Sequence, residues 1–446
     1  MTAVLSAEQV VSLQRTVEAW CATQDLPPQL DAAERLAQAV GRVVTATTLA
    51  AAVTQWGPRL GYVGPTLACA CHHSARFVGH RSRWLRGIAG EVQVSRAYYH
   101  CSHCHTGQCP WDHTQGLDRD AFTPTLKAEL AYLSSHLVYR EAQAVWARLT
   151  GQSLCVSQVE TGVRQVGARL RAAATARCTR LFADGVLPPA DPFAATVVGQ
   201  RAYLCVDGTH AYTDGSPHEV KVAVFFRGEP PVPRRAATAP GDTAGPGRYL
   251  ALEAEAADFG KRLYSFALPL GCERARELVI LGDGAPWIWN LADQHFSDAR
   301  QILDFYHAAE HVWRLARAVF AEDDPAGDRW AHTCTEALRT GGWHGLRRCV
   351  RTLRPLRRTA AQRRAVGAEL AYFRRHRRRL DYPRYREEGL LIGSGPVEAA
   401  CKSVVGQRLK GTGMRWSRDG ADAILAVRTA VLGHEEAQLA WAARAA

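Results

Sequence analysis

Two aspartates stand where apolar, strand-like runs of the sequence end. Asp207 follows YLCV and precedes Gly208, and Asp283 follows LVILG and precedes Gly284. A carboxylate projected beyond the end of a strand is a hard oxygen ligand of the kind that Mg²⁺ prefers. A lone Asp-Gly pair is usually only a turn. Two such pairs, each after a short apolar run, indicate a metal-dependent phosphoryl-transfer site.

The segment GSGPVEAACKS adds a third carboxylate with a lysine beside it. Pro396 near the first helical position predicts a helix start. Glu398 then lies in the first turn, and Lys402 follows at i+4 on the same face. The two side chains are either a metal ligand next to a phosphate-binding ammonium or an ordinary surface pair. The two strand-end aspartates favour the first interpretation.

Cysteine and histidine are concentrated in residues 61–115, which hold five of the 13 Cys and seven of the 17 His. Two cysteine pairs flank the strand-like runs RFVGHRSRWLRG and EVQVSRAYYH, which predict a β-hairpin. Four thiolates from two closely spaced cysteine pairs, joined by a β-hairpin, make a tetrahedral Zn²⁺ site. The first pair has C-x-C spacing where C-x-x-C is expected, so His72 or His73 stays open as a ligand in place of Cys69. The predicted zinc ligands are Cys69, Cys71, Cys101 and Cys104.

Residues 346–386 are rich in arginine. A solvated helical face is one interpretation, but so many guanidinium groups with few acids repel one another unless a polyanion neutralises them. We therefore predict DNA contact, and assign it first to Arg374, Arg375, Arg377, Arg378 and Arg379. The fifteen arginines are Arg347, Arg348, Arg351, Arg354, Arg357, Arg358, Arg363, Arg364, Arg374, Arg375, Arg377, Arg378, Arg379, Arg384 and Arg386.

The composition supports the same partner. The 446 residues carry a formal net charge of +12, which favours nucleic acid or an anionic membrane surface. A hydrophobic content of 47% excludes a mostly disordered chain. Because there is no uninterrupted apolar run of about 18 residues and no visible secretion signal, we expect no membrane partner, reduced thiols and a cytoplasmic location.

The elements that must position these residues form a multidomain α/β chain. The segment 137–167 has the pattern helix, Gly-containing turn, helix, with Ser157 as the expected N-cap of the second helix. It is either a helix-turn-helix or a simple αα-hairpin. The predicted order is a helical segment 1–60, a zinc-ribbon-like module 61–115, a helical, helix-turn-helix-like part 116–182, a linker 183–200 and a catalytic α/β domain 201–446.

Four long strings in this order resemble bacterial insertion-sequence transposases of the ISKra type, within the DDE superfamily. They are CVDGTH (205–210), LGDGAPWIWN (281–290), ILDFYHAAEH (302–311) and GSGPVEAACK (393–402). VSRAYYHCSHC (94–104) and RLKGTGMRWS (408–417) also fit the resemblance, which spans most of the chain from about residue 70 onward.

The resemblance implies an RNase H-like catalytic core with a mostly helical insertion, at about 308–392. It implies that Asp207, Asp283 and Glu398 hold Mg²⁺ (or Mn²⁺), and that His307, in a D-x-x-H motif with Asp304, lies near the scissile phosphate. Lys402 and Lys410 would contact DNA.

The expected partner of such a transposase is double-stranded DNA, at the transposon ends and the target. We expect a homodimer or higher oligomer on DNA, in the nucleoid. Two alternatives remain at this point. One is a metal-dependent nuclease of the same fold that cleaves without joining. The other is a DNA-binding regulator on an inactive transposase scaffold, against which the intact set of three carboxylates counts.

Overall fold

The computed structural model describes residues 6–24, 29–57, 60–117, 121–228, 247–321, 324–353 and 359–444. Its backbone contacts divide the chain into two compact units. The first holds Met1–Leu126 with Arg148–Gln152, and the second holds Lys127–Ala147 with Ser153–Ala445. Both units contain helices and one sheet, so the chain has a mixed α/β fold.

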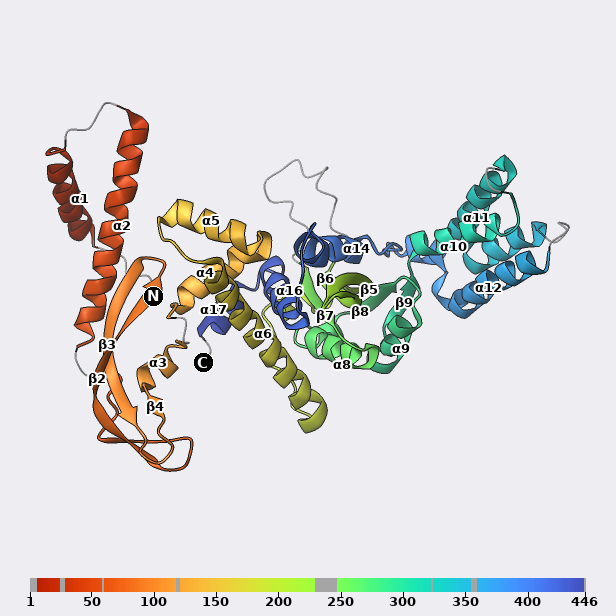
Figure 1. Cartoon of the computed structure of the whole chain (residues 1–446). Helices are drawn as coiled ribbons and strands as arrows, with labels where there is room; N and C mark the ends of the chain where they lie inside the picture. Colours follow the sequence, from red (N-terminus) through yellow and green to blue (C-terminus); the bar gives the residue numbers. More distant parts are fainter. Residues whose placement is uncertain are drawn as a thin grey trace. The chain divides into compact units, whose positions relative to one another are not determined.

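The first unit is built on a four-stranded antiparallel sheet in the order β1-β2-β3-β4 (Figure 1). Its long strands β2 (Ser74–Gly87) and β3 (Gly90–His100) confirm the predicted hairpin, and Gly87 pairs with Gly90 at the turn. Gly90 has a φ of 116°, a conformation that glycine adopts without strain. The other elements are α1 (Ala7–Cys21), α2 (Leu30–Gln55), β1 (Thr66–Ala68), β4 (Gly107–Gln108) and α3 (Pro110–Thr114).

Helix α2 has an apolar face that covers this sheet. Leu49 and Val53 pack against a cluster of Leu85, Val92 and Val94. By length and composition alone α2 could also cross a membrane, since its most apolar window has a mean hydropathy of 1.4. None of this window is buried in the structure, and length and composition alone do not show a span, so the absence of a membrane partner stays a prediction.

Three helices come next in the chain: α4 (Pro124–His136), α5 (Tyr139–Thr150) and α6 (Val156–Asp184). The prediction that Ser157 caps α6 is wrong, because the helix begins at Val156 and Cys155 is its N-cap. The side-chain amide oxygen of Gln158 accepts the backbone N–H of Cys155 at 3.2 Å. A capping box built on a thiol thus starts the helix earlier than the serine pattern indicated.

The second unit has a five-stranded mixed sheet in the order β7-β6-β5-β8-β9. The first three strands of this order are antiparallel, and β8 and β9 run parallel to β5. Long apolar runs in β5 and β6 are buried on both faces, as in sheets covered on two sides. The strands are β5 (Arg201–Thr213), β6 (Ser216–Arg227), β7 (Arg248–Glu253), β8 (Glu277–Gly282) and β9 (Arg300–Leu303).

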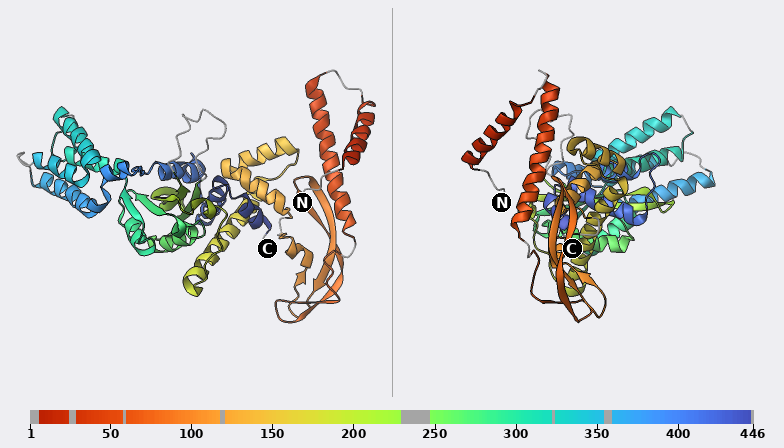
Figure 2. Two further views of the ribbon diagram at one scale, coloured as in Figure 1. Left: turned by 180° about the vertical axis from the view of Figure 1, so that it is seen from behind. Right: turned by 60° about the vertical axis from the view of Figure 1, so that its left-hand side comes forward.

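Helices surround this sheet and continue beyond its β9 edge. Helix α16 packs on both α6 and β7, whereas α14 lies against β5 and β6. After β9 the described chain is helical, and α10, α11 and α12 form a group of their own in Figures 1 and 2. The helices are α7 (Ala194–Val197), α8 (Ala256–Ala267), α9 (Pro286–His295), α10 (Phe305–Arg317), α11 (Pro325–Thr352), α12 (Ala360–His376), η2 (Arg377–Arg379), α13 (Tyr382–Glu387), α14 (Gly395–Ala400), η3 (Cys401–Gly406), α15 (Gln407–Leu409), α16 (Arg418–Leu432) and α17 (Glu436–Arg444).

Candidate functional site

The register of the parallel strands brings three aspartates to one edge of the sheet. Val206 of β5 pairs with Gly282 of β8, which in turn pairs with Leu303 of β9. The residues that follow these three are Asp207, Asp283 and Asp304. The prediction that Asp207 ends a strand is wrong, because β5 continues to Thr213 and Asp207 pairs with Val222 of β6. The parallel pairing nevertheless stops at Val206, Gly282 and Leu303, so the three carboxylates follow the last paired residues at the same level of the sheet.

Asp207 is half-buried and lies within reach of other negative charges. Burial raises the pKa of its carboxyl, a hydrogen bond from the Gly208 N–H (2.7 Å) opposes that rise, and the charges of Asp283 and Glu398 raise the pKa further. The Cys401 thiol donates to Asp207 Oδ2 at 3.7 Å. Cys401 begins η3, a π-helical turn directly after α14. Such turns are frequent at functional sites.

Asp283 sits in a tight turn between β8 and α9. Its Oδ1 accepts the Ala285 N–H at 2.9 Å, and its backbone carbonyl accepts the Tyr372 hydroxyl at 3.1 Å. Gly284 has a φ of 98°, and a Cβ there would collide with the Tyr372 hydroxyl. Glycine at position 284 is therefore required by the close approach of α12 as well as by the turn.

Asp304 and Glu398 share one hydroxyl. Ser394 Oγ donates to Asp304 Oδ2 and lies 3.2 Å from Glu398 Oε1. Asp304 is only 2% exposed and caps α10, because its Oδ1 accepts the Tyr306 N–H at 2.7 Å. Burial raises the pKa of the Asp304 carboxyl, the hydrogen bonds oppose it, and the charge of Glu398 adds to the rise. Ser394 thus connects the last strand end to the exposed Glu398.

His307 belongs to a chain of side chains from α10 and α12. Its Nε2 is 3.3 Å from Nε2 of His311, whose Nδ1 is hydrogen-bonded to Glu369. The His311 ring stacks on Tyr372 with centroids 3.6 Å apart. Sequence reasoning missed Glu369, Tyr372 and His311. Only the i,i+4 spacing of the two histidines could have suggested that they meet.

The four predicted zinc ligands come together in the first unit. The Sγ atoms of Cys69 and Cys104 are 3.5 Å apart, those of Cys71 and Cys101 are 3.6 Å apart, and all four lie within 4.8 Å of one another. Cys69 and Cys71 lie in the turn before β2, and Cys101 and Cys104 lie in the turn after β3. In the first turn the Cys69 N–H donates to the His73 carbonyl at 2.8 Å. The cluster is compatible with zinc.

The structure distinguishes the two histidines, His72 and His73, that the sequence left open as zinc ligands. Cys71, His73 and His103 form a second group of ligand atoms within 4.8 Å, and the two imidazoles stack at 3.6 Å. His72 belongs to neither group. In the described part of the chain, these are the two places where ligand atoms of three or more Cys, His, Asp or Glu residues lie within 4.8 Å of one another. The carboxylates of Asp207, Asp283 and Glu398 are therefore further apart than this.

The predicted DNA-binding cations differ in their surroundings. Lys410 Nζ donates to Thr209 Oγ1 at 2.6 Å, two residues beyond Asp207, and Lys402 is exposed. Arg379 is packed, since its Nε donates to Gln301 and its guanidinium lies 4.3 Å from the Trp289 ring centroid. The exposed arginines of the predicted set are Arg374, Arg375, Arg377 and Arg378, whereas Arg354, Arg357 and Arg358 lie outside the described residues.

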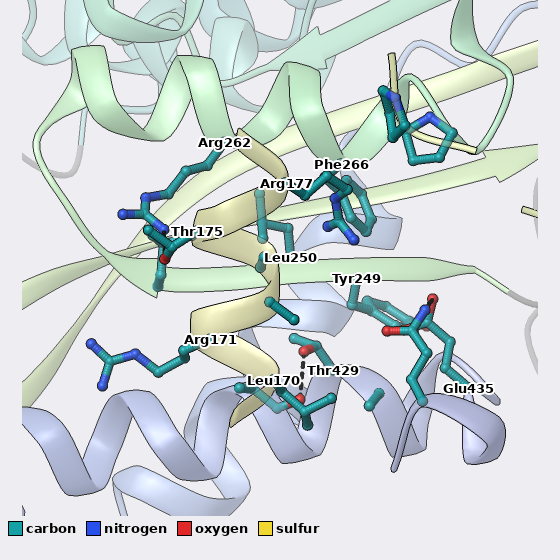
Figure 3. A pocket seen from close by; sticks show the side chains of 18 of the residues that line it. Leu170, Arg171, Thr175, Arg177, Tyr249, Leu250, Arg262, Phe266, Thr429 and Glu435 are labelled. Atoms are coloured by element: carbon teal, nitrogen blue, oxygen red, sulfur yellow. Dashed lines mark hydrogen bonds between the residues drawn. The ribbon is translucent and has the colours of Figure 1, made fainter. Parts of the chain in front are cut away.

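A hollow of about 440 Å³ lies elsewhere in the second unit, among α6, β7, α8 and α16 (Figure 3). Its lining includes Arg177, Tyr249 and Glu435 but not Asp207, Asp283 or Asp304. Burial raises the pKa of Glu435 to about 7, although Arg248, with Nε 3.6 Å from Glu435 Oε1, opposes that rise. Three arginines and five carboxyl groups line the hollow.

A protein-family model matches the C-terminal part of the chain. Residues 251–444 are similar to an uncharacterised protein family, UPF0236, a match that includes Asp283, Asp304 and Glu398 but not Asp207. No curated protein matches the chain.

Proposed function

We propose that this protein is the DNA transposase of an insertion sequence of the ISKra type, in the DDE superfamily. It binds the terminal inverted repeats and catalyses metal-dependent DNA strand cleavage and strand transfer. The observation that carries the proposal is the register that aligns Asp207 and Asp283 at one sheet edge, with the charge of Glu398 felt at Asp207.

The topology of the sheet supports an RNase H-like core. Three antiparallel strands followed by two parallel ones, in the order β7-β6-β5-β8-β9, match the arrangement that the sequence resemblance implies. The helices from Phe305 to Glu387 stand between the last strand and Glu398, which is where the helical insertion is expected.

The donor set fits divalent magnesium or manganese. Burial, and after it the charges of Asp283 and Glu398, raise the pKa of the Asp207 carboxyl, so a bound cation would relieve a repulsion already present in the protein. Asp207, Asp283 and Glu398 would hold Mg²⁺, which supplies charge stabilisation at the phosphate and activates the attacking oxygen. Ser394 and the Gly208 N–H orient two of these carboxylates, and the His311–Glu369 pair orients His307.

The remaining parts serve DNA binding in this proposal. The cysteine cluster would hold one Zn²⁺ and so tie the start of β2 to the end of β3. The hairpin and the helix pair α5–α6 would read the terminal repeat. Lys402, Lys410 and the exposed arginines at the end of α12 and just after it would contact phosphates. Two transposon ends in one assembly require at least a dimer.

The experiment uses purified full-length protein, Mg²⁺ or Mn²⁺, and labelled DNA that carries the ends of its element. Wild type is compared with Asp283→Asn and with the matched control Asp298→Asn, an exposed carboxylate outside the site. We expect end cleavage and joining in wild type and in the control, and a loss of both, by at least about 100-fold, in Asp283→Asn.

Two other outcomes would replace the proposal. Cleavage without joining would identify a metal-dependent nuclease on the same fold. DNA binding with neither activity, identical in all three proteins, would identify a DNA-binding regulator.

A further inference from the structure

A second hollow, of about 610 Å³, lies between α11 and α12 and is independent of the carboxylates. One wall is the half of α11 that follows a break at Gly342, and the other is the end of α12. Gly342 has a φ of 52°, and a Cβ there would lie 2.6 Å from the Leu380 carbonyl oxygen. This glycine fixes the direction in which the second half of α11 leaves, and therefore the shape of the hollow.

The rim of the hollow is uniformly positive. Arg347 and Arg351 on α11 face it together with Arg374 at the end of α12 and Arg377 just after it. All four are exposed, and within the described part of the chain no carboxylate lies within 4.0 Å of their guanidinium groups. Four like charges around one hollow repel one another unless an anion joins them.

The floor of the hollow is apolar and carries an aromatic ring. Leu346 is fully buried, and Val350, Leu370 and the half-buried Trp343 complete the lining. The Arg347 guanidinium lies 5.8 Å from the Trp343 ring centroid. An indole beside guanidinium groups is the combination on which proteins stack unpaired bases while they neutralise the backbone phosphates.

We propose that this hollow binds one unpaired nucleotide of a DNA strand, with its base against Trp343 and its phosphates between the arginines. Bases inside a duplex are stacked on their neighbours and present no free ring face, so the nucleotide must be extruded or single-stranded. Its size lies within the ~300–1,000 Å³ of small-ligand sites. The inference rests on the proposed function because it takes the nucleotide from the DNA that the protein processes.

The test uses full-length protein and a duplex with one unpaired 5-iododeoxyuridine. After irradiation and digestion with trypsin, the crosslink should lie in the peptide Thr340–Arg347, which contains Trp343. An excess of the fully paired duplex should not displace it. Displacement by free deoxyadenylate as efficient as by the unpaired DNA would overturn a DNA strand as the source.

Paired variants separate this site from general charge. The variant that removes charge from the hollow, called the groove variant, is Arg347→Gln/Arg374→Gln/Arg377→Gln. Its control removes the same charge one residue later each time, at Arg348, Arg375 and Arg378, none of which lines the hollow. We expect the groove variant to lose the preference for unpaired over paired DNA by about tenfold, and the control to keep it.

The outcomes distinguish the two proposals. If wild type binds paired DNA but the crosslink lies outside Thr340–Arg347, or both variants lose the preference equally, only the nucleotide site is wrong. If wild type binds neither paired nor unpaired DNA, the proposed function fails with it. Trp343→Leu, which keeps the arginines, should abolish the crosslink while paired-DNA affinity is retained.

Discussion

At the residue scale, the candidate site consists of carboxylates that the strand register aligns and of neighbouring groups that hydrogen-bond to them. The apolar runs before Asp207 and Asp283 made these two predictable from the sequence. The roles of Ser394 and Tyr372 were not, because their partners lie about 90 residues away in the chain. Local patterns carry no information about such long-range contacts.

The buried Asp304 should matter for folding as well as for the site. Asp304→Ala removes the N-cap of α10 and the acceptor of Ser394, so we expect a loss of about 2 kcal/mol in the free energy of unfolding. Asp304→Asn keeps a capping oxygen and should lose less. Urea unfolding of the two variants measures the difference, and equal losses would show that the cap is unimportant.

Glu435 predicts a pH dependence of stability. Its pKa is raised from the ordinary 4.5 to about 7 by burial, so the folded protein holds a proton that the unfolded chain releases. Stability therefore falls as the pH rises from about 4.5 to about 7, by at most about 3 kcal/mol. Glu435→Gln cannot ionise, and its stability relative to wild type should rise across this window.

The control for that measurement is the exposed neighbour Glu436→Gln. Its unfolding midpoint should follow wild type at pH 5 and at pH 8. If Glu435→Gln follows wild type as well, burial does not perturb the Glu435 carboxyl.

At the scale of elements, periodicity predicted the hairpin β2–β3 and the strand β8 before Asp283, but β5 extends past Asp207 to Thr213. The predicted start of α6 was wrong because Cys155 occupies the N-cap position that serine usually takes. The break inside α11 escaped prediction as well. GG within a helical pattern signals a weak point, but only the contact with the Leu380 carbonyl makes glycine essential there.

Two glycine substitutions on neighbouring helices should have opposite effects. Gly342→Ala places a Cβ against a backbone carbonyl in a left-handed conformation, and we expect a loss of about 2 kcal/mol or more. Gly367→Ala, in the middle of α12 with nothing within 4 Å, should gain up to about 1 kcal/mol. Thermal unfolding of both variants checks this, and a stable Gly342→Ala would mean that the break relaxes freely.

At the scale of the whole molecule, the cysteine cluster and the carboxylates lie in different units of the chain. The cysteine spacing predicted the cluster in the first unit, including the irregular C-x-C pair, because a β-hairpin brings its two ends together. Composition and charge predicted a polyanionic partner, but they could not show which arginines are exposed. Arg379 has the same sequence context as its neighbours and is nevertheless packed on Trp289.

Removal of zinc should therefore affect one unit and spare the other. Cys101→Ser/Cys104→Ser should bind no zinc, where wild type is expected to bind one ion per chain, and hydrogen exchange should accelerate in β2 and β3 while the strands β5 and β8 stay protected. Cys109→Ser is the control, since Cys109 belongs to neither ligand group. Retention of one zinc per chain in the double variant would rule out the site.

The helical insertion also sets an order in time. Glu398 lies 115 residues after Asp283, so a ribosome that adds about 5–20 residues per second needs about 6–23 s to supply the last ligand. A nascent chain has by then completed its cysteine cluster and its sheet. Polypeptides that terminate early would occupy the DNA ends without cutting them, so under the proposed function incomplete translation products act as competitors of the full-length protein.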